Sequence, residues 1–169
     1  MSKPAAWLSL LCGWPEKATI RQPGTLSREN WSKPYSPVFR YGWEESYERL
    51  KRAGKWSSSD GLTLEYENPL TGGPVMPTMG ARLELIAAKT KLKRHTGSVI
   101  YQVAQGRGSS EVGGRRFDWQ EKDIFALPSW AVHSHANASA TEDAVLFSFN
   151  DFPAMRALAL YREEAVPQA

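Results

Sequence analysis

Apolar and polar residues alternate along most of the chain after Leu62, and this alternation predicts β-strands. It is clear in LTLEY, ARLELIAA and SVIYQVAQ, and short apolar runs recur in DIFALP and EDAVLFSFN. A period of two places successive side chains on opposite faces of a strand. Short strands repeated every roughly 8 to 12 residues favour a β-sandwich or a β-barrel.

Two segments rich in glycine or proline separate these strands. ENPLTGGPVMPTMG predicts a rigid, irregular loop, because its prolines and glycines interrupt any regular element. Gly113 and Gly114, between SSEV and RRFDW, predict a hairpin with a two-residue turn, which requires positive φ.

A short amphipathic helix precedes the strands. In WEESYERLKRA, residues 43–53, Trp43, Tyr47 and Leu50 share one face, and Gly54 stands where a C-terminal cap belongs. A second helix follows the last strand: DFPAMRALALYREEA has Asp151 and Pro153 at its start and apolar positions spaced for a packed helix.

The helices and strands divide the chain into three parts. Residues 1–36 are rich in proline, serine and charge without a sustained period, and we interpret them as an arm. Residues 37–60 form the amphipathic helix and a linker, and residues 61–169 form a barrel with a C-terminal helix. A chain of 169 residues suffices for this single domain and its arm.

Composition narrows the classes of partner. The net charge is +3 and the basic residues are scattered, so we expect no nucleic-acid partner. The first residues are only faintly like a signal peptide and no apolar run could span a membrane, so we expect no membrane association. The single cysteine, Cys12, excludes an intrachain disulfide and fits the reducing cytoplasm.

The three histidines of the chain could meet inside the barrel. His133 and His135 share one face of a strand, and His95 lies on the same face as Val99 and Tyr101, which is apolar and therefore directed inward. A His-x-His pair with a third histidine from a facing strand could bind Fe, Zn, Cu or Ni. The alternative is three hydrogen-bonded interior histidines without a metal.

Both histidine segments resemble the two motifs of the cupin superfamily. In the second motif Pro128, His133 and Asn137 match, whereas Lys122 and Trp130 occupy two positions that are glycine in the family. In the first motif His95 matches the second histidine. Lys93 stands in place of the first histidine, and Val99 stands in place of the glutamate. Two of the four usual metal ligands are therefore kept, and we consider His135 a candidate third ligand.

A closer resemblance is carried by NPLTGGP, MPT, D-x-F-x-x-P-S-W and VLFSF-x-D-x-P, found between Tyr35 and Glu164. Together these phrases resemble gentisate 1,2-dioxygenase and the related 1-hydroxy-2-naphthoate and salicylate dioxygenases. The resemblance implies a mainly β, single cupin fold, a double-stranded β-helix or jelly-roll barrel, with a short helix before it and one after it. It matches the C-terminal cupin of these two-cupin enzymes, whose iron is bound by the N-terminal cupin.

The resemblance leaves three functions open. The chain is a cupin related to the C-terminal half and without its own activity, a small metal-dependent ring-cleaving dioxygenase, or a non-catalytic binding and assembly module. In the second case His95, His133 and His135 would hold Fe(II), and Lys93 and Tyr101 would contact a small aromatic acid. A domain without metal is the equal alternative, and by resemblance we expect a homodimer.

Overall fold

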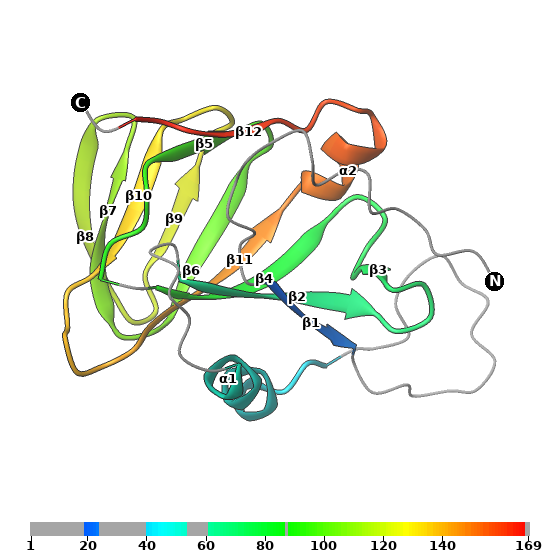
Figure 1. Ribbon diagram of the computed structural model, residues 1–169, viewed down its shortest axis with the longest axis horizontal. Helices are drawn as coiled ribbons and strands as arrows, with labels where there is room; N and C mark the ends of the chain where they lie inside the picture. The colour runs from blue at the N-terminus through cyan, green and yellow to red at the C-terminus, as the bar shows by residue number, and fades with distance from the viewer. Residues whose placement is uncertain (1–18, 24–39, 54–60, 87, 168–169) are drawn as a thin grey trace.

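The computed structural model describes residues 19–23, 40–53, 61–86 and 88–167, which form two β-sheets and two helices (Figure 1). The strands are β1 (Thr19–Pro23), β2 (Leu62–Asn68), β3 (Gly73–Pro74), β4 (Gly80–Ile86), β5 (Lys93–His95), β6 (Val99–Gln105), β7 (Arg107–Val112), β8 (Arg115–Gln120), β9 (Ile124–Leu127), β10 (His133–Asn137), β11 (Ala144–Asn150) and β12 (Glu163–Ala165). The helices are α1 (Trp43–Arg52) and α2 (Phe152–Ala157).

The two sheets have the topology of a jelly roll. One sheet runs β1-β2-β4-β11-β6-β9, with β3 paired to β2, and the other runs β12-β5-β10-β7-β8. All pairs are antiparallel except β1–β2. The expected mainly β cupin fold with a helix on each side is confirmed, as two sheets rather than one closed barrel.

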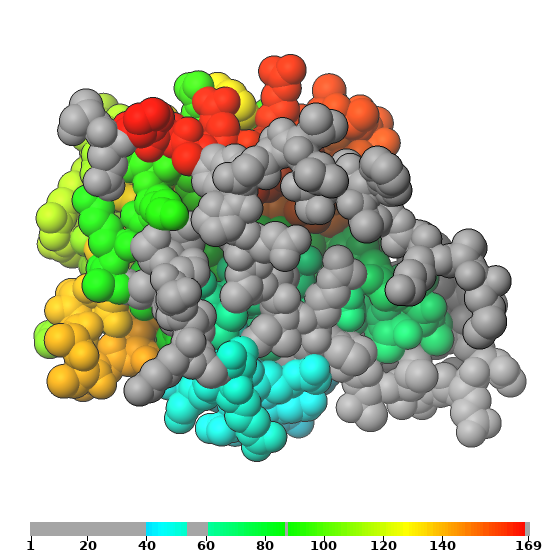
Figure 2. All heavy atoms as spheres, in the orientation of Figure 1, coloured from blue at the N-terminus to red at the C-terminus, as the bar shows by residue number. Residues whose placement is uncertain are grey.

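Helix α1 packs on the outer face of the seven-stranded sheet. Leu50 is fully buried there, against a cluster of sheet residues that includes Leu62, Leu64, Leu83, Leu85 and Val145. The space-filling view shows α1 in cyan along the lower edge of the molecule (Figure 2). The predicted helix and its apolar stripe are therefore confirmed, whereas Gly54 lies outside the described residues.

The inner faces of the two sheets enclose a second apolar cluster and a polar cavity. Val103, Leu127, Leu146 and Trp119 belong to the apolar cluster and are buried. Because the leucines of β2 and β4 face α1, the alternate residues of these strands, such as Glu65 and Arg82, point inward.

The segment from Lys93 to Val103, which we expected to be one strand, is divided between the two sheets. β5 belongs to the five-stranded sheet and β6 to the seven-stranded sheet. Between them Gly97 has φ +86°, and a Cβ atom there would lie 2.5 Å from Asp151 Oδ1. The side chains of His95, Val99 and Tyr101 are nevertheless all buried, so the expected inward direction is confirmed.

The second helix is shorter than expected. It begins next to Asp151 with Pro153 in its first turn but ends at Ala157, and Ala159 has φ +56°. The following residues, Glu163–Ala165, form β12 along the edge of β5. Pairing with an otherwise free strand edge thus replaces the last turns of the predicted helix.

The predicted arm contains a strand. β1 pairs in parallel with β2, from Thr19 opposite Thr63 to Pro23 opposite Glu67. We expected no regular element before Trp43, because this segment shows no sustained period. The predicted Gly113–Gly114 turn, by contrast, is confirmed: the two residues have φ +56° and +76° and join β7 to β8.

Two residues stand in the left-handed region where the cupin motif has glycine. Lys122 has φ +76° and Trp130 has φ +65°.

We predict that Lys122→Gly stabilises the protein by roughly 0.5–1 kcal/mol, because relief of the left-handed strain exceeds the entropy cost of glycine. Urea unfolding would measure the change. Lys122→Ala, which keeps a Cβ atom, is the control, and an equal gain in both variants would contradict the explanation.

Candidate functional site

The three histidines lie close together in the interior. His95 ends β5, and His133 and His135 lie on the adjacent strand β10, with His133 opposite Lys93 in the register. The ring centroids of His95 and His133 are 5.0 Å apart, and those of His133 and His135 are 5.6 Å apart. All three side chains are buried, so the arrangement expected from strand parity is present.

Each histidine of β10 is held by one hydrogen bond through Nδ1. His133 Nδ1 lies 3.0 Å from the carbonyl oxygen of Ala131, and His135 Nδ1 lies 2.7 Å from Ser110 Oγ. The Nε2 atoms of His133 and His135 are buried and have no hydrogen-bond partner among the described residues. A buried polar atom without a partner costs free energy, so both atoms mark a position that a further group would satisfy.

Burial keeps the two β10 histidines neutral. Removal from water, reinforced by the positive charge of Lys93, lowers the pKa of His133 and of His135 from 6.5 to about 3. Neutral imidazole is the form that binds metals and the form that can both donate and accept hydrogen bonds.

Aromatic rings surround the histidines. Phe152, at the start of α2, lies edge-on to His95 with centroids 4.7 Å apart, and Tyr101 lies edge-on to His135 at 5.0 Å. Phe125 stacks on Tyr101 at 5.1 Å. These contacts limit the rotation of the imidazoles and leave little room for the rings to change orientation.

A polar cavity of about 910 Å³ adjoins this cluster. It is lined by Thr63, Glu65, Arg82, Glu84, Lys93, His95, Val99, Tyr101, Ser148, Phe152, Arg156, Tyr161 and Glu163. Arg82 forms an ion pair with Glu65, and the hydroxyl of Tyr101 lies 3.4 Å from Glu84 Oε1. The two side chains expected to contact a substrate, Lys93 and Tyr101, both line this cavity.

The residues around the histidines differ from the usual cupin ligand set at two positions. Within the described part of the chain, no group of three or more His, Cys, Asp or Glu side chains is arranged to hold a metal ion. The position of the family's glutamate is the buried Val99, and the position of its first histidine is Lys93, an ammonium that has no lone pair to donate. His95, His133 and His135 are the imidazole donors that remain in this buried cluster.

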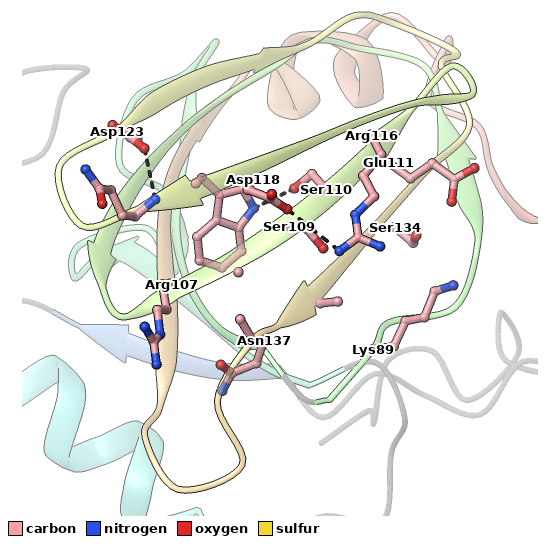
Figure 3. A pocket seen from close by; sticks show the side chains of 15 residues that line it. Lys89, Arg107, Ser109, Ser110, Glu111, Arg116, Asp118, Asp123, Ser134 and Asn137 are labelled. Atoms are coloured by element: carbon pink, nitrogen blue, oxygen red, sulfur yellow. Dashed lines mark hydrogen bonds and ion pairs between the residues drawn. The ribbon is translucent and has the colours of Figure 1, made fainter.

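A second hollow, of about 560 Å³, lies over β7, β8 and β10 (Figure 3). Arg107 and Arg116 are exposed at its margin, and Arg116 lies 3.7 Å from Asp118. Lys89 and Glu111 add charges of both signs, so the hollow has no preference for one sign of ligand.

Sequence reasoning missed the inward charges of β2 and β4 and the partner of His135. Arg82 and Glu84 alternate with leucines, a pattern usually typical of a solvent-facing side. The apolar stripe of residues 43–53 could have revealed this direction. Such a helix covers an apolar sheet face, so the leucines face the helix and the charged residues between them point inward. Ser110 gave no signal, because its role depends on a contact with a different strand.

Comparison with known proteins identifies the class of fold. Residues 83–150 match the family model described as a cupin domain, and they span β4 to β11, including all three histidines. A crystal structure of salicylate 1,2-dioxygenase from Pseudoaminobacter salicylatoxidans superposes with a TM-score of 0.72 at 28% sequence identity. That match covers 82% of this chain and 40% of the other.

The sequence comparisons narrow the class further. The chain is 40% identical over 160 residues to 5-aminosalicylate 1,2-dioxygenase of Comamonas sp, covering 89% of this chain and 42% of that protein. It is 37% identical over 133 residues to gentisate 1,2 dioxygenase 1 of Aquipseudomonas alcaligenes, covering 76% of this chain and 38% of that protein. It is therefore a cupin domain related to the gentisate and salicylate dioxygenases, and it spans about two fifths of the length of these relatives.

The comparisons also correct the extent of the resemblance. The motifs that carried the resemblance lie between Tyr35 and Glu164. The 89% of the chain that aligns with the Comamonas protein is more than residues 35–169 could supply. The similarity therefore reaches into residues 1–34, where β1 pairs with the sheet. No helix in the described residues is long and apolar enough to cross a membrane.

The lowered pKa values predict acid sensitivity. Below pH 6.5 the unfolded chain binds protons at His133 and His135, whereas the folded chain does not until about pH 3. The free energy of unfolding should therefore fall by roughly 2 kcal/mol for each histidine between pH 7 and pH 5.

Urea unfolding at several pH values would measure this fall, and His135→Gln should remove about half of the loss. The comparison is made between pH values within each variant, so that the general cost of the substitution cancels. An unchanged pH dependence in His135→Gln would show that carboxylates, rather than this histidine, cause the loss.

Proposed function

We propose that the chain is the non-catalytic cupin of a gentisate-type, ring-cleaving aromatic-acid dioxygenase and supports an iron-bearing cupin domain without holding iron itself. One observation carries this proposal: Lys93, where the family has a histidine ligand, lies opposite His133 in the register. Burial is the main cause of the lowered pKa values of the two β10 histidines, and the charge of Lys93 lowers these pKa values further. A cation facing the histidines opposes the binding of a metal cation.

The other substituted position supports the same proposal. Val99 is buried within the apolar cluster and offers no oxygen in place of the glutamate. In the cavity beside it Arg82 forms an ion pair with Glu65 and Tyr101 donates to Glu84. A small aromatic acid remains a candidate ligand of this cavity, with Lys93 as the partner of its carboxylate.

The second candidate function is a small Fe(II)-dependent dioxygenase that uses His95, His133 and His135. It is favoured by the two neutral, buried imidazoles of β10, whose Nε2 atoms have no partner among the described residues. It requires the three imidazoles to direct a lone pair at one metal ion.

The outer face of the seven-stranded sheet supports the proposed homodimer. Beyond α1 this face carries Ile100, Ile124 and Phe149, which are 54%, 69% and 44% exposed. Ile100 is opposite Phe149 in the register, so the two form one uncharged patch. Apolar residues grouped on an antiparallel sheet indicate a contact surface. We place the dimer in the cytoplasm, in keeping with the single cysteine.

Metal content tests the proposed function. After anaerobic incubation with Fe(II) and desalting, we expect near-zero iron in the wild type and in His133→Ala, measured by mass spectrometry. Lys93→His restores the family's ligand and removes the cation, so it should raise the iron content above that of the wild type.

Oxygen uptake with gentisate or 5-aminosalicylate provides the second measurement, and we expect none from the chain alone. Iron at one ion per wild-type chain, lost in His133→Ala, would overturn the proposed function in favour of the second candidate. Iron that is bound equally by the wild type and His133→Ala would indicate adventitious binding outside the histidine cluster.

A further inference from the structure

Three buried side chains from neighbouring strands form a hydrogen-bonded series. Trp119 Nε1 on β8 donates to Ser110 Oγ on β7 at 2.9 Å, and Ser110 Oγ lies 2.7 Å from His135 Nδ1 on β10. Figure 3 shows Ser110 and the bond it receives. Trp119, Ser110 and His135 are 4%, 1% and 1% exposed, so solvent does not compete for these bonds.

The hydrogen-bond donors and acceptors around Ser110 determine which nitrogen of His135 carries the proton. A serine hydroxyl has one hydrogen and two lone pairs, and one lone pair already accepts from Trp119. If His135 Nδ1–H also donated to Ser110, the hydroxyl hydrogen would have no acceptor among the described residues, and His135 Nε2 would be an unsatisfied acceptor.

The opposite arrangement leaves fewer unsatisfied groups. When the Ser110 hydroxyl donates to His135 Nδ1, every polar group of the series is satisfied except the proton on His135 Nε2. Each unsatisfied buried donor costs about 1–3 kcal/mol, so this arrangement is the stable one. His135 then carries its proton on Nε2.

His133 has the other tautomer. Its Nδ1 lies 3.0 Å from the carbonyl oxygen of Ala131, which can only accept, so Nδ1 carries the proton and Nε2 holds the lone pair. The two imidazoles are neutral and their centroids are 5.6 Å apart.

We propose that Ser110 is a positioning residue that fixes His135 as the Nε2–H tautomer, so that His135 and His133 present a hydrogen-bond donor and an acceptor side by side. This inference deepens the proposed function and rests on it, since a bound metal would impose its own tautomer. Each Nε2 atom suits a water molecule or a neutral hydroxyl group, which would accept from His135 Nε2–H or donate to His133 Nε2. A metal ion requires a lone pair from each ring, and His135 offers none on Nε2.

Imidazole ¹⁵N spectra of the full chain test the tautomers directly. Long-range correlations to the ring hydrogens distinguish a protonated from an unprotonated nitrogen near neutral pH. We expect protonated Nε2 in His135 and protonated Nδ1 in His133. In Ser110→Ala we expect His135 to become a mixture of both tautomers while His133 is unchanged.

Two further variants separate this role from a merely structural one. Ser110→Thr keeps the hydroxyl and should retain the His135 tautomer. Trp119→Phe removes only the indole donor, and it should also retain this tautomer, because the Ser110 hydrogen still has no better acceptor. Protonated Nδ1 in wild-type His135, or an unchanged His135 in a folded Ser110→Ala, would overturn the inference.

The wild-type spectrum decides the matter even if Ser110→Ala does not fold. Iron content, measured separately, keeps the two proposals distinguishable. Iron-free protein with protonated Nδ1 in His135 would refute the tautomer assignment alone. Iron bound through His133 would refute the proposed function.

Discussion

The packing of α1 against the seven-stranded sheet determines which side chains of β2 and β4 point into the interior of the fold. Leu62 and Leu64 of β2, with Leu83 and Leu85 of β4, are committed to the outer face, where Leu50 covers them. Strand geometry then forces the intervening residues inward. The jelly roll consequently has an apolar end around Val103 and Leu127 and a charged end around Arg82, and the histidines lie between the two.

The separation of the interior into an apolar end and a charged end explains why this domain, which lacks two of the four usual cupin ligands, still has polar side chains inside. At the charged end Arg82 forms an ion pair with Glu65, and the charge of Lys93 acts on the histidines. Low dielectric strengthens each of these interactions and also penalises any unmatched charge. Lys93 and Val99, which replace two of the family's ligands, lie in the same interior as these charges and the histidines.

The sequence predicted features that depend on local pattern and missed those that depend on contacts between distant strands. The inward direction of His95, His133 and His135, the Gly113–Gly114 turn and helix α1 follow from periodicity and turn chemistry. The break at Gly97 could not be predicted in this way, because it is set by the proximity of Asp151. Strand β12 likewise replaced predicted helix because β5 offered an edge, and the role of Ser110 requires knowing the register of β7 with β10.

Strand β12 forms a short section of the wall around the polar cavity. It pairs with β5 over only three residues, from Glu163 opposite His95 to Ala165 opposite Lys93, and Glu163 and Tyr161 line the cavity. A wall segment with so few ladder bonds opens locally at a lower free energy than the long pairs of β11 with β4 and β6. Amide hydrogens of β12 should therefore exchange before those of the central strands, which leaves the wall of the cavity beside Glu163 less rigid than the sheet opposite.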